Sequence, residues 1–349
     1  MKTLVVGGLW LLGSTLLAQQ QQGDAKPKKP YEPPPTFQDQ KPIEMTLYAP
    51  FSQLRKDRQP ETQYRHGWIV YKSDSGDVRV PARLRTRGIY RKKNCEIPPL
   101  LVNFTKDSTK KTIFAKNDRL RLTLHCKDND DYEQYVLQEY NIYRVQRQLT
   151  KYSYDVRLAR VTYVDSEKKD TLTTRWAFFQ EQDDAFTDRV GAELVTTQGA
   201  GPSDLNPYES AFFGVWQYFV GNSDFSIRAL HNVVLVLKDD EHVPVARDFD
   251  WSGAVAARYA VPNPILKIRS VTQRVMRGYC SDPAEYEKVF ALFKEKKDAI
   301  YGQYRDSLMA PLMKPNVVAN TLRYFDQFYE TIEDPREAKR QIVERCLAG

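Results

Sequence analysis

The stretch that decides the fold covers residues 218–253 and reads YFVGNSDFSIRALHNVVLVLKDDEHVPVARDFDWSG. Its pattern predicts a helix end, a polar loop, two short strands and a second acidic loop. The preceding residues 207–220 are apolar on nearly every side, which is typical of a buried helix. Residues 233–237 are rich in β-branched side chains and predict a strand. Residues 243–246 predict its partner, across an acidic turn.

The polar groups at the two ends of this hairpin are those that phosphoryl transfer requires. Transfer to a hydroxyl needs a carboxylate that orients the hydroxyl, and an amide and a carboxylate that hold magnesium against the phosphates. Asp224 precedes the hairpin, Asn232 lies at its first strand, and Asp248 follows it. Asp and Asn are also ordinary turn residues, so a surface hairpin with acidic turns is the alternative interpretation.

This region resembles that of atypical kinases, particularly the spore-coat CotH kinases and the HipA-type kinases. The shared pattern is Gly-Asn-x-Asp at residues 221–224, an Asn at the next strand, and an Asp-containing loop in place of Asp-Phe-Gly. The resemblance is at the level of motifs. In ordinary kinases the Asn comes five residues after the catalytic Asp, whereas Asn232 comes eight after Asp224. The second loop reads Asp-Phe-Asp, so Asp248 and Asp250 compete for the metal role.

A row of arginines follows the strand predicted at residues 78–84. Arg83, Arg85 and Arg87 alternate and therefore point to one face. Three guanidiniums on one side are costly unless solvent or an anion meets them. One interpretation is a solvated sheet face. The other is a phosphate-facing turn, because the Arg-x-Arg-Gly string resembles the start of the CotH-type region, which implies that Arg85 and Arg87 contact the nucleotide.

A second strand and a helix supply the remaining candidates. The resemblance implies that Arg121, in the strand predicted at residues 119–125, replaces the ATP-pairing lysine of kinases, with Lys127 as second candidate. Residues 132–149 predict an amphipathic helix, with Glu139 on or beside its apolar stripe. An unpaired carboxylate there is expensive, and kinases form a Lys–Glu pair. We therefore expect Arg121 to meet Glu139, with a solvated Glu at the stripe edge as the alternative.

The charge of the chain is modestly basic. The 349 residues contain 52 Lys and Arg against 45 Asp and Glu, a net charge of +7. The densest basic run is Arg91-Lys92-Lys93, which is too short to favour nucleic acid and is expected to lie in a solvated loop. We therefore expect no nucleic-acid partner.

Four cysteines indicate disulfides rather than a metal site. An even count in an exported protein predicts two disulfides with three connectivities, of which Cys95–Cys126 with Cys280–Cys346 is the most local. The sequence has no CxxC pair and its four histidines are scattered, so zinc is not expected.

The N-terminus predicts export. Residues 1–18, MKTLVVGGLWLLGSTLLA, match a secretory signal peptide and are too short to span a membrane comfortably. An uncleaved anchor is the alternative, and membrane contact is expected only in that case. Residues 19–42 are rich in Gln and Pro and predict a disordered or extended tether. The mature protein is expected to be periplasmic or secreted.

These patterns predict an α+β, bilobal, protein-kinase-like fold. Residues 43–180 would form a β-rich N-lobe with one helix, and residues 181–349 a mostly helical C-lobe, with a hinge at residues 180–182. Length permits one large domain or two such lobes.

The resemblance implies an exported ATP-dependent phosphotransferase that uses Mg²⁺ or Mn²⁺. Its acceptor would be an unknown hydroxyl, and a protein is one candidate for the molecule that carries it. Asp224 would orient that hydroxyl, Asn232 and Asp248 would hold the metal, and Asp250 would supply a second metal contact. The alternative is a non-catalytic relative that binds a ligand or partner at the cell envelope. A hydrolase using Asp248 and Asp250 is disfavoured, since both lie on one face of an extended segment and would not flank a bond.

Overall fold

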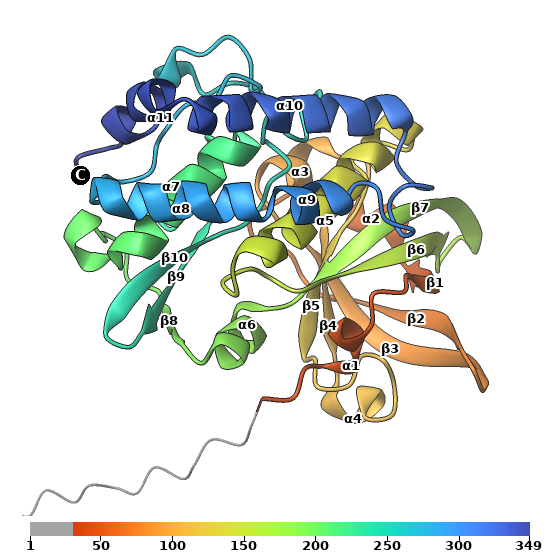
Figure 1. Ribbon diagram of the computed structural model, residues 1–349. Coiled ribbons are helices and arrows are strands. Elements are labelled where there is room, and N and C mark those ends of the chain that lie inside the picture. The colour runs from red at the N-terminus through yellow and green to blue at the C-terminus, as the bar shows by residue number, and fades with distance from the viewer. Residues whose placement is uncertain (1–30) are drawn as a thin grey trace, which may run out of the picture. The chain divides into compact units, whose positions relative to one another are not determined.

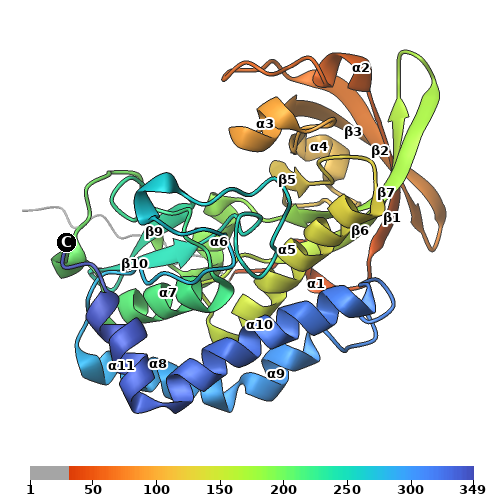
Figure 2. The same ribbon diagram turned by 90° about the horizontal axis from the view of Figure 1, so that it is seen from above.

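The computed structural model describes residues 31–349, of which residues 32–349 form one compact unit. The predicted signal peptide and the first part of the Gln- and Pro-rich segment lie outside the described residues. The described chain is an α+β protein, with a strand-rich first half and a mostly helical second part (Figures 1 and 2). No helix in the described part of the chain is long and apolar enough to span a membrane.

The first half is a closed seven-stranded barrel. Going round it, the strands are β1 (Ile43–Ala49), β2 (Arg65–Ser73), β3 (Gly76–Thr86), β4 (Leu100–Phe104), β5 (Arg119–Thr123), β7 (Asp170–Gln180) and β6 (Val156–Asp165). Neighbours pair antiparallel except β1 and β6, which pair in parallel and close the barrel. Alternate residues of β1 are buried, as expected for a strand with one face on the barrel core.

The long helix of this half is α5 (Asp130–Leu149), which connects β5 to β6. The Asn129 side chain caps it by accepting a hydrogen bond from the backbone N of Tyr132 at 3.1 Å. Its apolar residues belong to the core of the second part of the protein rather than to the barrel core. Four short helices accompany the strands: α1 (Pro35–Gln38), α2 (Phe51–Leu54), α3 (Tyr90–Asn94) and α4 (Lys106–Thr109).

The second part is built around α7 (Pro207–Val220), which is buried on every side from Ser210 onward. Phe219 lies in a cluster of rings that includes Phe293 and Phe325. These rings come from the surrounding helices α8 (Pro283–Glu295) and α10 (Pro315–Glu333). The other elements are α6 (Asp183–Val190), α9 (Lys297–Gly302), α11 (Pro335–Gln341) and a small sheet of β8 (Glu193–Val195), β9 (Val233–Lys238) and β10 (Glu241–Ala246).

The structure confirms the α+β class, the α7 helix, the β9–β10 hairpin and the two disulfides Cys95–Cys126 and Cys280–Cys346. The closed barrel was not predicted, and the kinase-like bilobal arrangement stays a prediction. Part of the segment expected to be a tether is folded, since α1 buries Thr36 and Phe37. The Arg157 guanidinium fixes this segment by donating to the carbonyls of Lys41 and Asp39.

Candidate functional site

The two polar loops of the quoted stretch are joined at their glycines. Helix α7 ends at Gly221, whose φ of 66° is left-handed. A Cβ there would approach the Tyr324 hydroxyl oxygen to 1.9 Å, so the position requires glycine. The Gly221 carbonyl accepts a hydrogen bond from the backbone N of Gly253 at 2.9 Å. The loop that carries Asp224 is therefore anchored to the loop that carries Asp248.

Asp224 and Asn232 are in direct contact. Asn232 Nδ2 donates to the backbone oxygen of Asp224 at 2.8 Å and to its Oδ2 at 3.1 Å. His231 Nε2 lies 3.1 Å from the other carboxylate oxygen of Asp224. The Asp224 side chain is 39% exposed and therefore accessible to solvent.

Arg277 holds the Asp224 loop from a distant part of the sequence. Its Nη1 donates to the carbonyls of Ser223 and Phe225, the two residues that flank Asp224. Its guanidinium also lies over the Phe225 ring, 5.2 Å from the centroid. Sequence analysis missed this residue because a lone Arg in an irregular segment carries no spacing signal. Its position shows that the loop conformation is fixed from both sides.

A cavity of about 160 Å³ lies beside these loops. Three arginines, Arg87, Arg121 and Arg247, face it together with two of the expected metal ligands, Asn232 and Asp248. The complete lining is Arg87, Arg121, Thr123, Tyr143, Gln180, Asn232, Arg247 and Asp248. The fold thus unites residues from β5, β7, α5 and both polar loops in one predominantly cationic cavity.

Arg121 is held by Asp183, at the start of α6. Its Nη2 lies 2.9 Å from both carboxylate oxygens of Asp183, and Tyr154 donates its hydroxyl to the same carboxylate at 2.6 Å. Burial opposes ionisation of Asp183, but the guanidiniums of Arg121 and Arg247 outweigh it and lower the pKa of this carboxyl. Nη1 of Arg121 and Nε2 of Gln180 are buried without a hydrogen-bond partner, although both residues line the cavity.

Arg87 is the least compensated charge of the cavity. Its side chain forms no hydrogen bond or ion pair with the described residues. Burial, together with the nearby positive charge of Arg121, lowers the pKa of Arg87 to about 10, although Asp248 acts in the opposite direction. The group is still protonated at neutral pH. A bound anion would relieve this repulsion.

Behind the cavity, three carboxylates converge on Arg91 of α3. Nη1 of Arg91 lies 3.1 Å from Glu139, Nη2 lies 2.9 Å from Asp248, and Nε lies 3.3 Å from Asp250. One oxygen from each carboxylate lies within 4.8 Å of the others, a spacing that could suit a metal ion. The guanidinium, which is only 7% exposed, already supplies the positive charge of this cluster.

The pKa values of the three carboxylates are shifted in different directions. Burial raises the pKa of Glu139, and it raises that of Asp250 far above its usual range, in both cases against the attraction of Arg91. Burial also opposes ionisation of Asp248, but Arg91, Arg87 and Arg247 outweigh it and lower the pKa of that carboxyl. Asp248 is therefore the ionised carboxylate that faces the cavity, and it is the better of the two candidates for a metal. Asp250 instead interacts with Tyr259 and lines no part of the cavity.

The expected pair between Arg121 and Glu139 is wrong. Strand β5 pairs with β7 so that Arg121 lies opposite Gln180, which places its guanidinium at the start of α6, where Asp183 is the acceptor. Glu139 meets Arg91 instead. The expectation of a solvated loop at residues 91–93 is also wrong for its first two residues, since Arg91 and Lys92 are buried.

Two other candidates lie away from the cavity. The Arg85 guanidinium lies over the Tyr64 ring, 5.0 Å from its centroid, and Arg85 is not among the lining residues. Arg83 lies over the same ring. Lys127 Nζ lies 5.6 Å from the centre of the Tyr132 ring and is likewise outside the lining. Of the arginine row, only Arg87 reaches the cavity, because it follows the last residue of β3.

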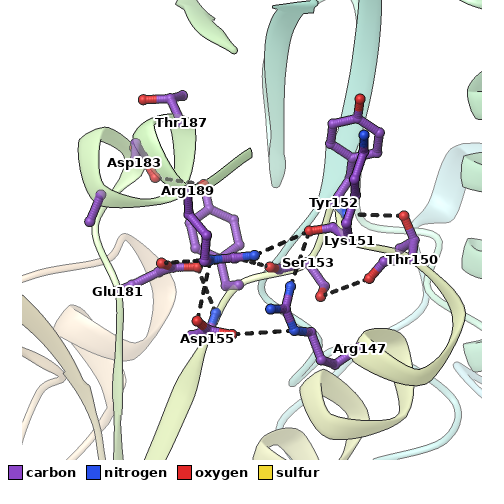
Figure 3. A network of polar contacts seen from close by, with 12 residues as sticks. Arg147, Thr150, Lys151, Tyr152, Ser153, Asp155, Glu181, Asp183, Thr187 and Arg189 are labelled. Carbon is purple, nitrogen blue, oxygen red and sulfur yellow. Dashed lines mark hydrogen bonds and ion pairs between the residues drawn. The ribbon is translucent and has the colours of Figure 1, made fainter. Parts of the chain in front are cut away.

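The residues expected to form the hinge take part in a network of polar contacts (Figure 3). Glu181 is fully buried, forms an ion pair with Arg189, and accepts a hydrogen bond from the backbone N of Asp155 at 2.7 Å. Arg189 Nε also lies 3.2 Å from the Asp155 carboxylate, to which Arg147 adds a contact at 3.4 Å. Burial raises the pKa of Glu181 to about 7 although Arg189 opposes the shift. This network connects the last residues of β7 to α6, and so fixes Gln180 and Asp183 beside the cavity.

The chain matches no protein-family model and no curated protein in the comparisons made with each.

Proposed function

We propose that this protein is an exported phosphotransferase that moves a phosphoryl group from ATP, bound with Mg²⁺ or Mn²⁺, to a hydroxyl acceptor. One observation carries the proposal. A single cavity combines three guanidiniums with Asn232 and Asp248, and Asn232 in turn contacts Asp224. Phosphoryl transfer depends on positioning and on stabilisation of phosphate charge, and these groups supply both.

Each residue has a distinct role in this proposal. Arg87, Arg121 and Arg247 bind phosphate oxygens, for which guanidinium groups are well suited. Asp248 is ionised and binds the divalent ion, because hard cations prefer carboxylate oxygens. Asn232 donates through Nδ2 to Asp224, which leaves its side-chain oxygen for the same ion.

Asp224 acts on the acceptor. Its exposed carboxylate accepts the proton of the attacking hydroxyl as that oxygen bonds to the terminal phosphorus. The bond between the terminal phosphorus and its bridging oxygen breaks, and ADP leaves. Arg277 is a positioning residue in this scheme, because it holds the backbone on both sides of Asp224.

The proposed location outside the cytoplasm rests on two observations. The N-terminal sequence matches a signal peptide. All four cysteines are paired in disulfides, as is typical of proteins in oxidising compartments.

A second candidate function is a non-catalytic binding module of the cell envelope. It is favoured by Arg91, whose guanidinium already lies among Glu139, Asp248 and Asp250. If Arg91 keeps Asp248 from a divalent ion, the cavity binds an anion without metal and transfers nothing.

Two matched variants separate these functions. Asp248→Asn should weaken ATP affinity in the presence of Mg²⁺ at least tenfold, about 1.4 kcal/mol, because it removes the ionised metal ligand. Asp224→Asn should leave affinity within about threefold but lower transfer by about 10²-fold or more, since orienting the acceptor is a task of the transition state. Calorimetry gives the affinities, and loss of ATP to ADP with phosphate on an acceptor gives transfer.

The control is Asp239→Asn, because Asp239 lies in the exposed turn between β9 and β10. It should change neither quantity. Equal and metal-independent binding by the wild type and by Asp248→Asn would reject the phosphotransferase and leave the binding module.

A further inference from the structure

The lining of the cavity is suited to a phosphate chain and offers no place for a base. Seven of the eight side chains end in charged or uncharged polar groups, and the eighth, Tyr143, uses its hydroxyl to accept a hydrogen bond from the backbone N of Asp248 at 2.9 Å. At about 160 Å³ the cavity is smaller than the roughly 300–1,000 Å³ typical of sites for drug-sized organic ligands. A purine would have no apolar slot within this lining.

Donors without partners mark where the ligand contacts the protein. Gln180 is 4% exposed, and its Nε2 has no hydrogen-bond partner. Arg121 Nη1 is also buried without one. The partly exposed Arg87 makes no ion pair with the described residues. Buried donors are normally satisfied, so these two buried donors, beside the unpaired Arg87 guanidinium on the same cavity, indicate a ligand with several acceptor oxygens. Their charge indicates that this ligand is an anion.

We infer that the site selects its donor by the phosphate chain and not by the base, so that inorganic tripolyphosphate and nucleoside triphosphates bind as one class. This inference rests on the proposed phosphotransferase function. With tripolyphosphate as donor, the terminal P–O–P link breaks and a P–O bond forms to the acceptor oxygen. The hydroxyl proton passes to Asp224 and then to solvent, and pyrophosphate leaves. No oxidant or further reactant is needed.

Calorimetry on the full mature chain with Mg²⁺ tests the inference. The ligands are ATP, GTP, tripolyphosphate and adenosine, each titrated separately. We expect dissociation constants for ATP, GTP and tripolyphosphate within about threefold of one another, and no binding of adenosine. An affinity for ATP at least tenfold higher than for both GTP and tripolyphosphate would overturn the inference, and would leave the phosphotransferase proposal intact.

A pair of arginine variants locates the binding at the cavity. Arg87→Met should weaken all three anions by the same factor, about tenfold or more, because it removes the uncompensated guanidinium. Arg83→Met is the matched control, since Arg83 lies on the preceding strand over the Tyr64 ring and outside the lining. It should leave the affinities unchanged. Equal loss in both variants, or none in Arg87→Met, would overturn the inference, and thermal melts establish that both variants are folded.

Transfer assays distinguish the inference from the function on which it depends. Binding of tripolyphosphate and ATP alike, without transfer from either, would reject the phosphotransferase and support selection by the phosphate chain. Transfer from ATP alone, with tripolyphosphate failing to compete, would reject the inference and support the phosphotransferase. Binding of no anion would reject both.

Discussion

Asp248 separates two charged regions that have opposite composition. On one side, three carboxylates share the single guanidinium of Arg91, within 3.3 Å in each case. On the other, Arg87, Arg121 and Arg247 face a cavity to which Asp248 contributes the one carboxylate of the lining. The acidic region is closed, since its cation is only 7% exposed and contacts every anion. The basic region is open and has donors without partners.

The difference teaches which charges serve the fold and which are left for a ligand. Aromatic rings adjoin the Arg91 cluster in the chain: the Tyr90 ring lies 5.1 Å from Trp251 and 5.9 Å from Tyr259, and Tyr259 interacts with Asp250. The buried members of this cluster, Arg91, Glu139 and Asp250, must be neutralised within the protein, because little water reaches them. The cavity has no corresponding internal anion for Arg87, so a ligand is the partner that would complete it.

The largest effect is expected from removing the charge of the closed region. Arg91→Met leaves Glu139, Asp248 and Asp250 without their shared cation, and we expect the free energy of unfolding to fall by about 3–5 kcal/mol. Arg91→Lys should recover only part of this loss, because a compact ammonium lacks the planar group whose three nitrogens each face one carboxylate. Denaturant unfolding of the three proteins measures both values.

The matched control for this comparison is Arg83→Met, on the exposed face of β3. Surface substitutions of this kind change stability by about 0.5 kcal/mol or less. An Arg91→Met protein as stable as the Arg83→Met protein would contradict the closed cluster. It would mean that the three carboxylates are neutral or hydrated.

A smaller effect is expected for the coupling free energy between charged residues. We expect coupling between residues in contact, and none between the cavity and the Arg91 cluster. Arg121 contacts Asp183, and Glu139 contacts Arg91. A double-mutant cycle on Arg121→Met and Asp183→Asn should therefore give a coupling of about 1–3 kcal/mol, as for residues in direct contact. The same cycle on Arg121→Met and Glu139→Gln should be additive to within about 0.5 kcal/mol. Denaturant unfolding gives all the free energies. A large coupling in the second cycle would show that the two regions interact.

The smallest effect concerns the junction that holds the cavity wall in place. The pKa of Glu181 is raised to about 7 by burial, against the attraction of Arg189. Between about pH 4.5 and pH 7 the folded protein therefore binds more protons than the unfolded chain, and stability must fall as pH rises. Glu181→Gln should make this slope less steep by about 1 kcal/mol per pH unit.

The control for this titration is Glu193→Gln, because Glu193 is exposed on β8. It should leave the slope unchanged. Carboxyls with lowered pKa, such as Asp183 and Asp248, act in the opposite sense, because their contribution is lost as pH falls below about 4. Their effect is common to the wild type and both variants, so the difference isolates Glu181. Parallel curves for all three proteins would reject a raised pKa at this site.

Local patterns predicted the elements of this fold well. The apolar run before Gly221 is helix α7, and the two β-branched stretches are β9 and β10. The two loops that carry Asp224, Asn232 and Asp248 are brought together because an antiparallel hairpin returns the chain to its starting edge. The contact between Asp224 and Asn232 was therefore within reach of sequence reasoning.

The partners of the charged side chains were not within reach, because they depend on elements far apart in the chain. Arg91 is separated from Asp248 by 157 residues and Arg121 from Asp183 by 62. No periodicity links such pairs. Arg91 belongs to a basic run whose composition is typical of a solvated loop, so the sequence did not indicate that it is buried. Its burial follows only from the packing of α3.

The sequence by itself determined the α+β class, the position of most helices and strands, and the groups that could serve phosphoryl transfer. The tertiary structure decided how the barrel closes, since the parallel pairing of β1 with β6 joins residues more than a hundred positions apart. It also decided the directions in which the pKa values of two neighbouring carboxyls shift. Asp248 and Asp250 are nearly equivalent in the sequence. Burial raises the pKa of Asp250, with the nearby carboxylates adding to the shift, whereas Arg91, Arg87 and Arg247 outweigh burial at Asp248 and lower its pKa.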